Sequence, residues 1–137
     1  MSFKLYDTSK GIGMLIGYAR TSTIEQHAGL EAQVRDLGDC EKVFQEQVSS
    51  VAKRQELDLA IDYLREGDTL VVTKLDRLAR STKHLMDIVD VLQVKGAHLS
   101  ILNLGVDTSA PTGKLMLTML GGVAEFEREI MLERQRE

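Results

Sequence analysis

The chain has 137 residues, 43% of them apolar and 28% charged, which fits one soluble domain with a buried core and excludes a disordered or membrane-spanning chain. The formal net charge of −4 gives no sign of a nucleic-acid partner, although several arginines stand near predicted element boundaries, where folding could gather them. The first residues contain no apolar segment of the length that a secretory signal requires, so a cytoplasmic location is expected.

Residues 1–13 show no periodicity and are expected to be a leader or a cloning remnant. Residues 14–18, with the sequence MLIGY, form an apolar run typical of a buried strand. Residues 25–38 are predicted to be a helix because apolar side chains recur on one face, and Gly38 is expected to end it.

A short strand is predicted over residues 42–45, and apolar residues between Leu57 and Leu64 have helical spacing. The clearest strand is TLVVT, residues 69–73. Its β-branched and continuous apolar character indicates a strand that is covered on both faces.

Residues 82–95 are predicted to be an amphipathic helix that ends at Gly96, and residues 98–104 to be a strand or a pair of strands. A loop is predicted over residues 105–113. From about Gly113 a last helix runs to the end of the chain, roughly 35 Å long at 1.5 Å per residue.

This last helix carries an apolar stripe, formed by Met116, Met119, Leu120, Val123, Phe126 and Ile130. The first two turns of the stripe are expected to cover the domain's own sheet and the remainder to face a partner, since the helix is longer than a domain of this size needs. Gly121 and Gly122 lower the stability of a helix, so the close approach of another backbone is expected beside them.

The alternation of strands and helices predicts an α/β fold with a mostly parallel sheet of four to five strands, helices on both faces, and one long C-terminal dimerisation helix. The predicted division is a catalytic-sized domain over residues 14–112 and a long helix over residues 113–137. Functional loops in such sheets follow the carboxyl ends of strands. The segments ARTS and KLDRLAR both fall at such ends.

Ser22 has two interpretations. It has capping-box spacing with Glu25, as Thr23 has with Gln26, so its hydroxyl could cap the following helix. Only one cap is needed, however, and Arg20 shares a side with Ser22 if the strand continues. An arginine beside a hydroxyl is typical of a phosphate or carboxylate site.

Arg77 and Arg80 are three residues apart, which places both guanidiniums on the same side of a helical turn. They could form a solvated turn in which Asp76 pairs with an arginine. Arginines at a helix start oppose the helix dipole, however, which indicates that they serve an external anion. Arginines near a serine suit attack on a phosphodiester, because fixed guanidiniums stabilise the added negative charge without a metal.

Neither a hydrolase elbow nor a phosphate-binding glycine loop is found, and no acidic, histidine or cysteine residues have a spacing that requires a metal. We therefore expect no cofactor and no metal.

Four segments, GYARTST, GDTLVVTKLDRLARST, GVDTSAPTGK and AEFEREIMLER, occur in the order and spacing of the serine recombinases, the resolvase and DNA-invertase family. The chain resembles the catalytic domain of this family and the start of its long helix over about residues 14–137. The resemblance implies that a serine attacks a DNA phosphate and forms a 5′-phosphoserine link, followed by strand exchange and religation.

The resemblance also implies roles for individual residues. Ser22 would be the nucleophile, with Arg20, Arg77 and Arg80 around the scissile phosphate and Arg54 as a further active-site arginine. Gln33 and Asp76 would be supporting residues, Asp76 orienting an arginine or shuttling a proton. Arg128 and Arg134 on the long helix would contact DNA.

The implied partners are site-specific double-stranded DNA, a second copy in a homodimer, and a tetramer in the synaptic complex, without a membrane. Family members continue into a DNA-binding domain, so we expect this chain to be a truncated form. Two other readings stay open: a receiver-like binding module on the same type of sheet, and a catalytically silent DNA-binding dimerisation module.

Overall fold

The computed structural model describes residues 13–22, 27–48, 54–79 and 81–136. Its centre is a five-stranded sheet in the order β2-β1-β3-β4-β5, in which only the last pair, β4 with β5, is antiparallel. The prediction of a mostly parallel sheet with four to five strands is confirmed. The strands are β1 (Leu15–Thr21), β2 (Lys42–Gln47), β3 (Thr69–Val72), β4 (His98–Ile101) and β5 (Val106–Asp107).

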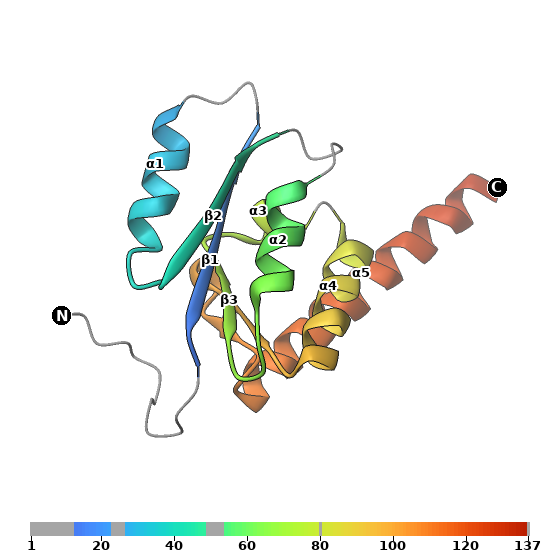
Figure 1. Cartoon of the computed structure of the whole chain (residues 1–137). Coiled ribbons are helices and arrows are strands. Elements are labelled where there is room, and N and C mark those ends of the chain that lie inside the picture. The colour runs from blue at the N-terminus through green and yellow to red at the C-terminus, as the bar shows by residue number, and fades with distance from the viewer. Residues whose placement is uncertain (1–12, 23–26, 49–53, 80, 137) are drawn as a thin grey trace.

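Helices cover both faces of this sheet, as predicted: α1 lies on one face, and α2 and α4 lie on the other (Figure 1). No helix in the described ranges is both long and apolar enough to cross a bilayer. The helices are α1 (His27–Asp36), α2 (Gln55–Tyr63), α3 (Leu75–Leu78), α4 (Thr82–Lys95) and α5 (Pro111–Arg136), with a 3₁₀ turn at Leu102–Leu104.

The core has two parts because β1 is buried along its whole length. Ile16 and Tyr18 point into the larger cluster, which α2 and α4 complete, whereas Leu15 and Ala19 pack with α1. Strand side chains alternate between the two faces, so a strand covered on both sides is apolar throughout. The core therefore fixes the carboxyl end of β1 from both faces.

Element boundaries follow local signals where these exist. The helix predicted over residues 82–95 is α4, because the Ser81 hydroxyl accepts a hydrogen bond from the His84 amide at 3.1 Å and Gly96 adopts a left-handed φ of 75°. β1 and β2 each extend past their predicted ends, and α1 ends at Asp36, before Gly38.

The segment before the last helix differs from the prediction. β5 lies inside the predicted loop 105–113, where it pairs with the end of β4. The last helix begins at Pro111, two residues before the predicted start, and proline suits a first helical position because it lacks the amide that a helix start leaves unbonded.

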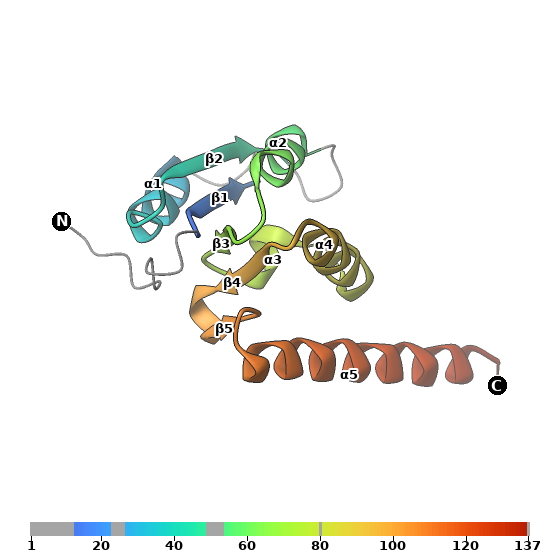
Figure 2. The ribbon, with the colours of Figure 1, turned by 60° about the horizontal axis from the view of Figure 1, so that its bottom comes forward.

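The way in which α5 contacts its own domain corrects the interpretation of its apolar stripe. Figure 2 shows α5 beside β5 and α4, with its C-terminal half extending away from the sheet. Gly113 and Leu117 are buried, whereas all six residues of the stripe are exposed, so the first turns of α5 pack against the domain through Gly113 and Leu117 and not through the stripe. The sequence pattern alone could not distinguish the buried Leu117 from its apolar neighbours.

The surroundings of Gly121 and Gly122 within this chain differ from the expected close approach of another backbone. A side chain at Gly121 would meet the Met86 side chain of α4 at 3.4 Å, and one at Gly122 would meet nothing within 4 Å. The close neighbour of Gly121 within this chain is therefore a flexible side chain and not another backbone.

Candidate active site

Arg20 and Ser22 both lie at the carboxyl end of β1. Arg20 is the sixth residue of β1 and is 5% exposed, and Ser22 follows the strand directly and is partly buried. α1 is described from His27, five residues after Ser22. The alternative capping residues Thr23, Glu25 and Gln26 lie outside the described residues, so the capping interpretation of Ser22 stays a prediction.

The Arg20 guanidinium connects three segments through backbone carbonyl groups. Its Nη1 donates to the Val48 carbonyl at 3.0 Å, beyond the end of β2. Its Nη2 donates to the Asp76 carbonyl at 3.0 Å and its Nε to the Arg77 carbonyl at 3.4 Å, both in α3. This buried cation is thereby fixed in position.

Arg54 approaches α3 from another direction. It precedes α2 and is 7% exposed, and its Nη1 donates to the Leu78 carbonyl. Three consecutive α3 carbonyls, those of residues 76–78, thus accept hydrogen bonds from Arg20 and Arg54. Arg77 belongs to α3 itself, so the buried guanidiniums of Arg20 and Arg54 are held on the helical turn that carries Arg77.

Gln33 holds the carboxyl end of β1. Its two described hydrogen bonds go to the backbone of Arg20 and not to the side chains of other candidate site residues. Its Oε1 accepts from the Arg20 amide at 3.1 Å, and its Nε2 donates to the Arg20 carbonyl at 2.8 Å. The pairing of β1 with β3 ends at Gly17 and Val71, so β3 supplies no backbone partner for Arg20. The Gln33 side-chain amide bonds to the Arg20 amide and carbonyl in its place. Gln33 therefore positions the backbone between the arginine and the serine.

Fully buried Tyr18 and half-buried Glu46 form a polar pair that the sequence interpretation did not identify. The Tyr18 hydroxyl donates to Glu46 Oε2 at 2.5 Å. Burial, followed by this hydrogen bond and the Glu46 charge, raises the pKa of Tyr18 well above its usual range, against a smaller opposing effect of Arg54 and Arg20. A signal was present, because Glu46 lies two residues after buried Phe44 in β2, at an inward-facing strand position.

Other predicted site residues lie at different distances from this cluster. Asp76 belongs to it through its carbonyl, and its side chain is exposed. Arg80 lies outside the described residues. Arg128 is exposed on α5, where the hydrogen bond and charge of Glu125, 2.9 Å away, raise the pKa of its guanidinium. Arg134 is exposed near the end of the same helix.

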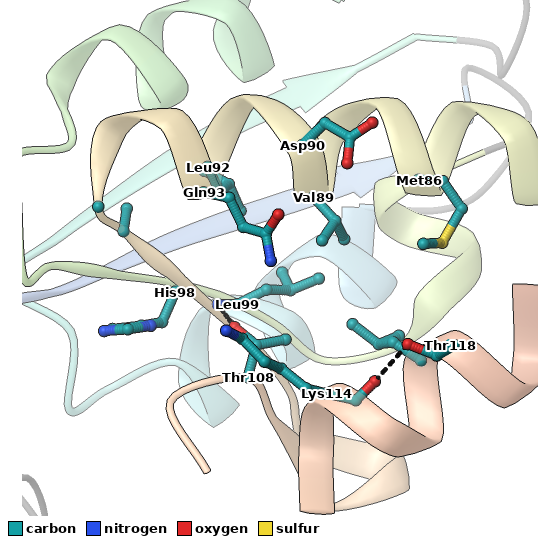
Figure 3. A pocket seen from close by; sticks show the side chains of 13 residues that line it. Met86, Val89, Asp90, Leu92, Gln93, His98, Leu99, Thr108, Lys114 and Thr118 are labelled. Carbon is teal, nitrogen blue, oxygen red and sulfur yellow. Dashed lines mark hydrogen bonds between the residues drawn. The ribbon is translucent and has the colours of Figure 1, made fainter. Parts of the chain in front are cut away.

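A separate pocket of about 430 Å³ opens between α4, β4 and the start of α5 (Figure 3). Val89, Leu99 and Leu117 supply apolar lining, and the Thr118 hydroxyl beside it donates to the Lys114 carbonyl at 3.0 Å. None of the predicted site residues lines this pocket. The convergence of cations, and not the pocket, therefore defines the candidate site.

Comparison with known proteins identifies the family of the chain. Residues 15–137 match the family model described as the resolvase N-terminal domain. The chain is 40% identical over 120 residues to the DNA-invertase hin of Salmonella typhimurium, covering 87% of this chain and 63% of that protein. It is 42% identical over 122 residues to the serine recombinase gin of Escherichia phage Mu, covering 88% of this chain and 63% of that protein. It is also 40% identical over 130 residues to a resolvase of Clostridium perfringens, covering 90% of this chain and 69% of that protein.

Solved structures resemble the fold over most of its length. The N-terminal catalytic domain of TP901-1 integrase superimposes with a TM-score of 0.68 at 28% identity, covering 85% of this chain and 97% of that one. A resolvase family site-specific recombinase from Streptococcus pneumoniae gives a TM-score of 0.72 at 24% identity, covering 91% of this chain and 93% of that one, which supports the fold.

Proposed function

Because the chain belongs to the resolvase family, we propose that it is the catalytic part of a site-specific DNA recombinase in which Ser22 cleaves the DNA backbone. The observation that supports this most directly is that Arg20, at the strand end that leads to Ser22, and Arg54 both donate to the carbonyls of the α3 turn that carries Arg77. The chain spans 63% of the length of its relatives hin and gin, so the activity of the whole protein is part of the proposal.

In the proposed reaction the Ser22 hydroxyl attacks the phosphorus of a DNA phosphodiester. A bond forms between Ser22 Oγ and phosphorus, and the bond between phosphorus and the 3′ oxygen breaks. The hydroxyl loses its proton, and the departing 3′ oxygen takes one up. The resulting 5′-phosphoserine ester keeps a phosphodiester, so the reverse attack by a 3′ hydroxyl rejoins the strand without a nucleotide cofactor.

The arginines would stabilise the transition state. Negative charge spreads over the phosphoryl oxygens during such a transfer, and fixed guanidiniums stabilise it best when they need no reorganisation. Arg20 has five N–H donors, of which its carbonyl contacts use three; in the proposed reaction the other two bind the phosphate. The carbonyls of α3 therefore serve to hold the cation that the reaction needs.

The proposed partners are double-stranded DNA and further copies of the chain. The exposed apolar stripe of α5 has the character of a dimer contact, and methionines suit a surface that repacks. Arg128 and Arg134, exposed along the same helix, would contact DNA phosphates. A dimer at each site and a tetramer during strand exchange complete the proposal.

The test uses the protein at the full length of its gene, incubated with DNA that flanks the gene, then denatured, nuclease-digested and analysed by peptide mass spectrometry. A nucleotide adduct on the Ser22 peptide, absent in Ser22→Ala, is expected. Ser22→Ala should keep the circular dichroism spectrum and the unfolding midpoint of the parent. Bound DNA without an adduct, even on a nicked duplex that prevents religation, would contradict the assignment and favour a silent DNA-binding module.

A further inference from the structure

One face of the sheet is covered by a helix over only part of its width. α1 packs on β1 and β2 (Figure 2). The strand register continues the same face from Val71 of β3 to Ser100 of β4 and Asp107 of β5. A second pocket, of about 310 Å³, opens on this part of the face, beside the end of α1.

The second pocket combines apolar side chains with carboxylates. Leu15, Leu37 and Val71 are buried in its lining, whereas Leu102 is 46% exposed. Three carboxylates also line it, those of Asp36, Asp39 and Asp107. None of the described residues that line it is a lysine or an arginine. A complementary ligand would therefore present apolar groups together with positive charge.

The N-terminal segment of the chain, residues 1–12, enters the domain beside this pocket. The Met14 amide donates to Asp68 Oδ1 at 3.1 Å, and the Met14 carbonyl accepts from the Thr69 amide at 2.9 Å. The next residue, Leu15, already lines the second pocket. The segment is therefore joined to the domain at a fixed point, and twelve residues can span about 40 Å when extended.

The amino acids of the N-terminal segment match the chemistry of the second pocket. Its sequence is MSFKLYDTSKGI, in which Phe3, Leu5 and Tyr6 supply apolar surface. Two lysines against one aspartate give its side chains a net charge of +1. The family match begins at residue 15, so this segment is a feature of the chain beyond the matched domain.

We propose that residues 2–12 dock in the second pocket of their own chain, with the side chains of Phe3 and Leu5 against its apolar lining and the lysines near its carboxylates. The short connection keeps the effective concentration of the segment high, which favours this occupant over a second copy or another protein. Docking would support β5, because Asp107 lines the pocket and lies against Gly113 at the start of α5. This inference does not depend on the proposed DNA cleavage.

Cys40 provides a probe of the docked state, because it is the only cysteine of the chain and lines the second pocket. The experiment measures the rate at which N-ethylmaleimide modifies Cys40 in the full-length protein. Deletion of residues 2–12 should raise this rate at least about tenfold, and Phe3→Ala should raise it at least about fivefold. Thr8→Ala is the matched control, since it shortens a polar side chain of the same segment, and it should change the rate by less than about twofold.

A variant of the pocket itself separates docking from a general loosening of the fold. Leu102→Asp adds a negative charge at a half-exposed position of the lining. It should raise the labelling rate of Cys40 in the full-length protein and have no further effect once residues 2–12 are deleted. Additive effects of the two changes, or equal labelling rates with and without the segment, would overturn the proposal.

Crosslinking locates the segment directly. A reagent that joins the Cys40 thiol to a lysine amine should give peptides that link Cys40 to Lys4 or Lys10. The crosslinked fraction should stay constant over about a hundredfold range of protein concentration, because docking is within one chain. Crosslinks of Cys40 only to lysines of residues 13–137 would overturn the proposal. Protection that rises with protein concentration would overturn it as well and assign the second pocket to another copy of the chain.

Discussion

Tyr18 illustrates how one buried residue connects protonation to the fold. Its hydroxyl lies against Glu46, and burial is the largest cause of its raised pKa, ahead of the hydrogen bond and the charge of Glu46. The positive charges of Arg54 and Arg20 act in the opposite direction and are smaller. Tyr18 therefore stays neutral in the folded protein at pH values where an exposed tyrosine ionises.

This shift predicts a loss of stability in alkali. The unfolded chain releases the Tyr18 proton as the pH rises above the ordinary value of 10.0, whereas the folded chain retains it, so the free energy of unfolding falls above that pH. At pH 11 the retained Tyr18 proton lowers the free energy of unfolding by about 1 kcal/mol. Urea unfolding of wild type and Tyr18→Phe at pH 8 and pH 11 should show a smaller decrease in the variant. Equal decreases would contradict the shifted pKa.

Residue type and position selected part of the candidate site from the sequence. Arg20 lies near the carboxyl end of β1, Ser22 follows that strand, and Arg77 follows β3; the carboxyl ends of parallel strands are where functional loops gather. Glu46 was missed because its contacts are with Tyr18 and the amides of α2, which only the folded chain brings together. The backbone role of Gln33 was hidden for the same reason, although the residue itself was selected.

The limits of a helix can be predicted from the sequence only where the residues that cap it are its neighbours in the chain. Ser81 and Gly96 bound α4 locally, so its limits were predicted correctly. α2 is capped by Glu46 and Lys95 from other elements, and its predicted limits were displaced by one or two residues. β5 was missed because two residues carry no recognisable period.

The start of α5 depends on the absence of a side chain at Gly113. A Cβ atom there would lie 2.0 Å from the Asp107 carbonyl oxygen, and this backbone atom cannot rotate away. Gly113→Ala should therefore lower the free energy of unfolding by at least about 2 kcal/mol, because β5 and α5 must separate.

Gly122→Ala is the control for this substitution, since a side chain at Gly122 meets nothing within 4 Å. Alanine there should raise the stability of the exposed helix by about 0.5–1 kcal/mol. Chemical unfolding of the two variants should move the midpoint in opposite directions. A stable Gly113→Ala protein with unchanged α5 would contradict the close approach.

For the whole molecule, the outstanding feature is an apolar surface that its own domain does not cover. The described side chains of α5 from Val123 onward are exposed, and Phe126 is 62% exposed. The alternation of elements in the sequence was enough to predict the sheet, and the length of α5 was enough to predict a projecting helix. Which turns contact the domain could not be predicted, because Leu117 and its apolar neighbours follow the same helical pattern.

The proposed self-association predicts that Phe126→Glu weakens dimer formation at least about tenfold, because a charge would enter an apolar contact. Sedimentation equilibrium gives the association constant, and circular dichroism checks that the fold is kept. Val94→Glu is the matched control, since Val94 is 88% exposed on α4. Equal dimer strength in Phe126→Glu, or equal weakening by both substitutions, would contradict a dimer contact through the stripe.

α5 packs against the domain near its N-terminal end, so a small tilt there moves its C-terminal end by a larger distance. Gly121 is the last described residue of α5 that is not exposed, and about 22 Å of helix follow it, at 1.5 Å per residue. A tilt of about 10° at this pivot would displace the far end by about 4 Å. A small shift where Gly121 lies beside Met86 is therefore amplified at the far end of the helix, near Arg134.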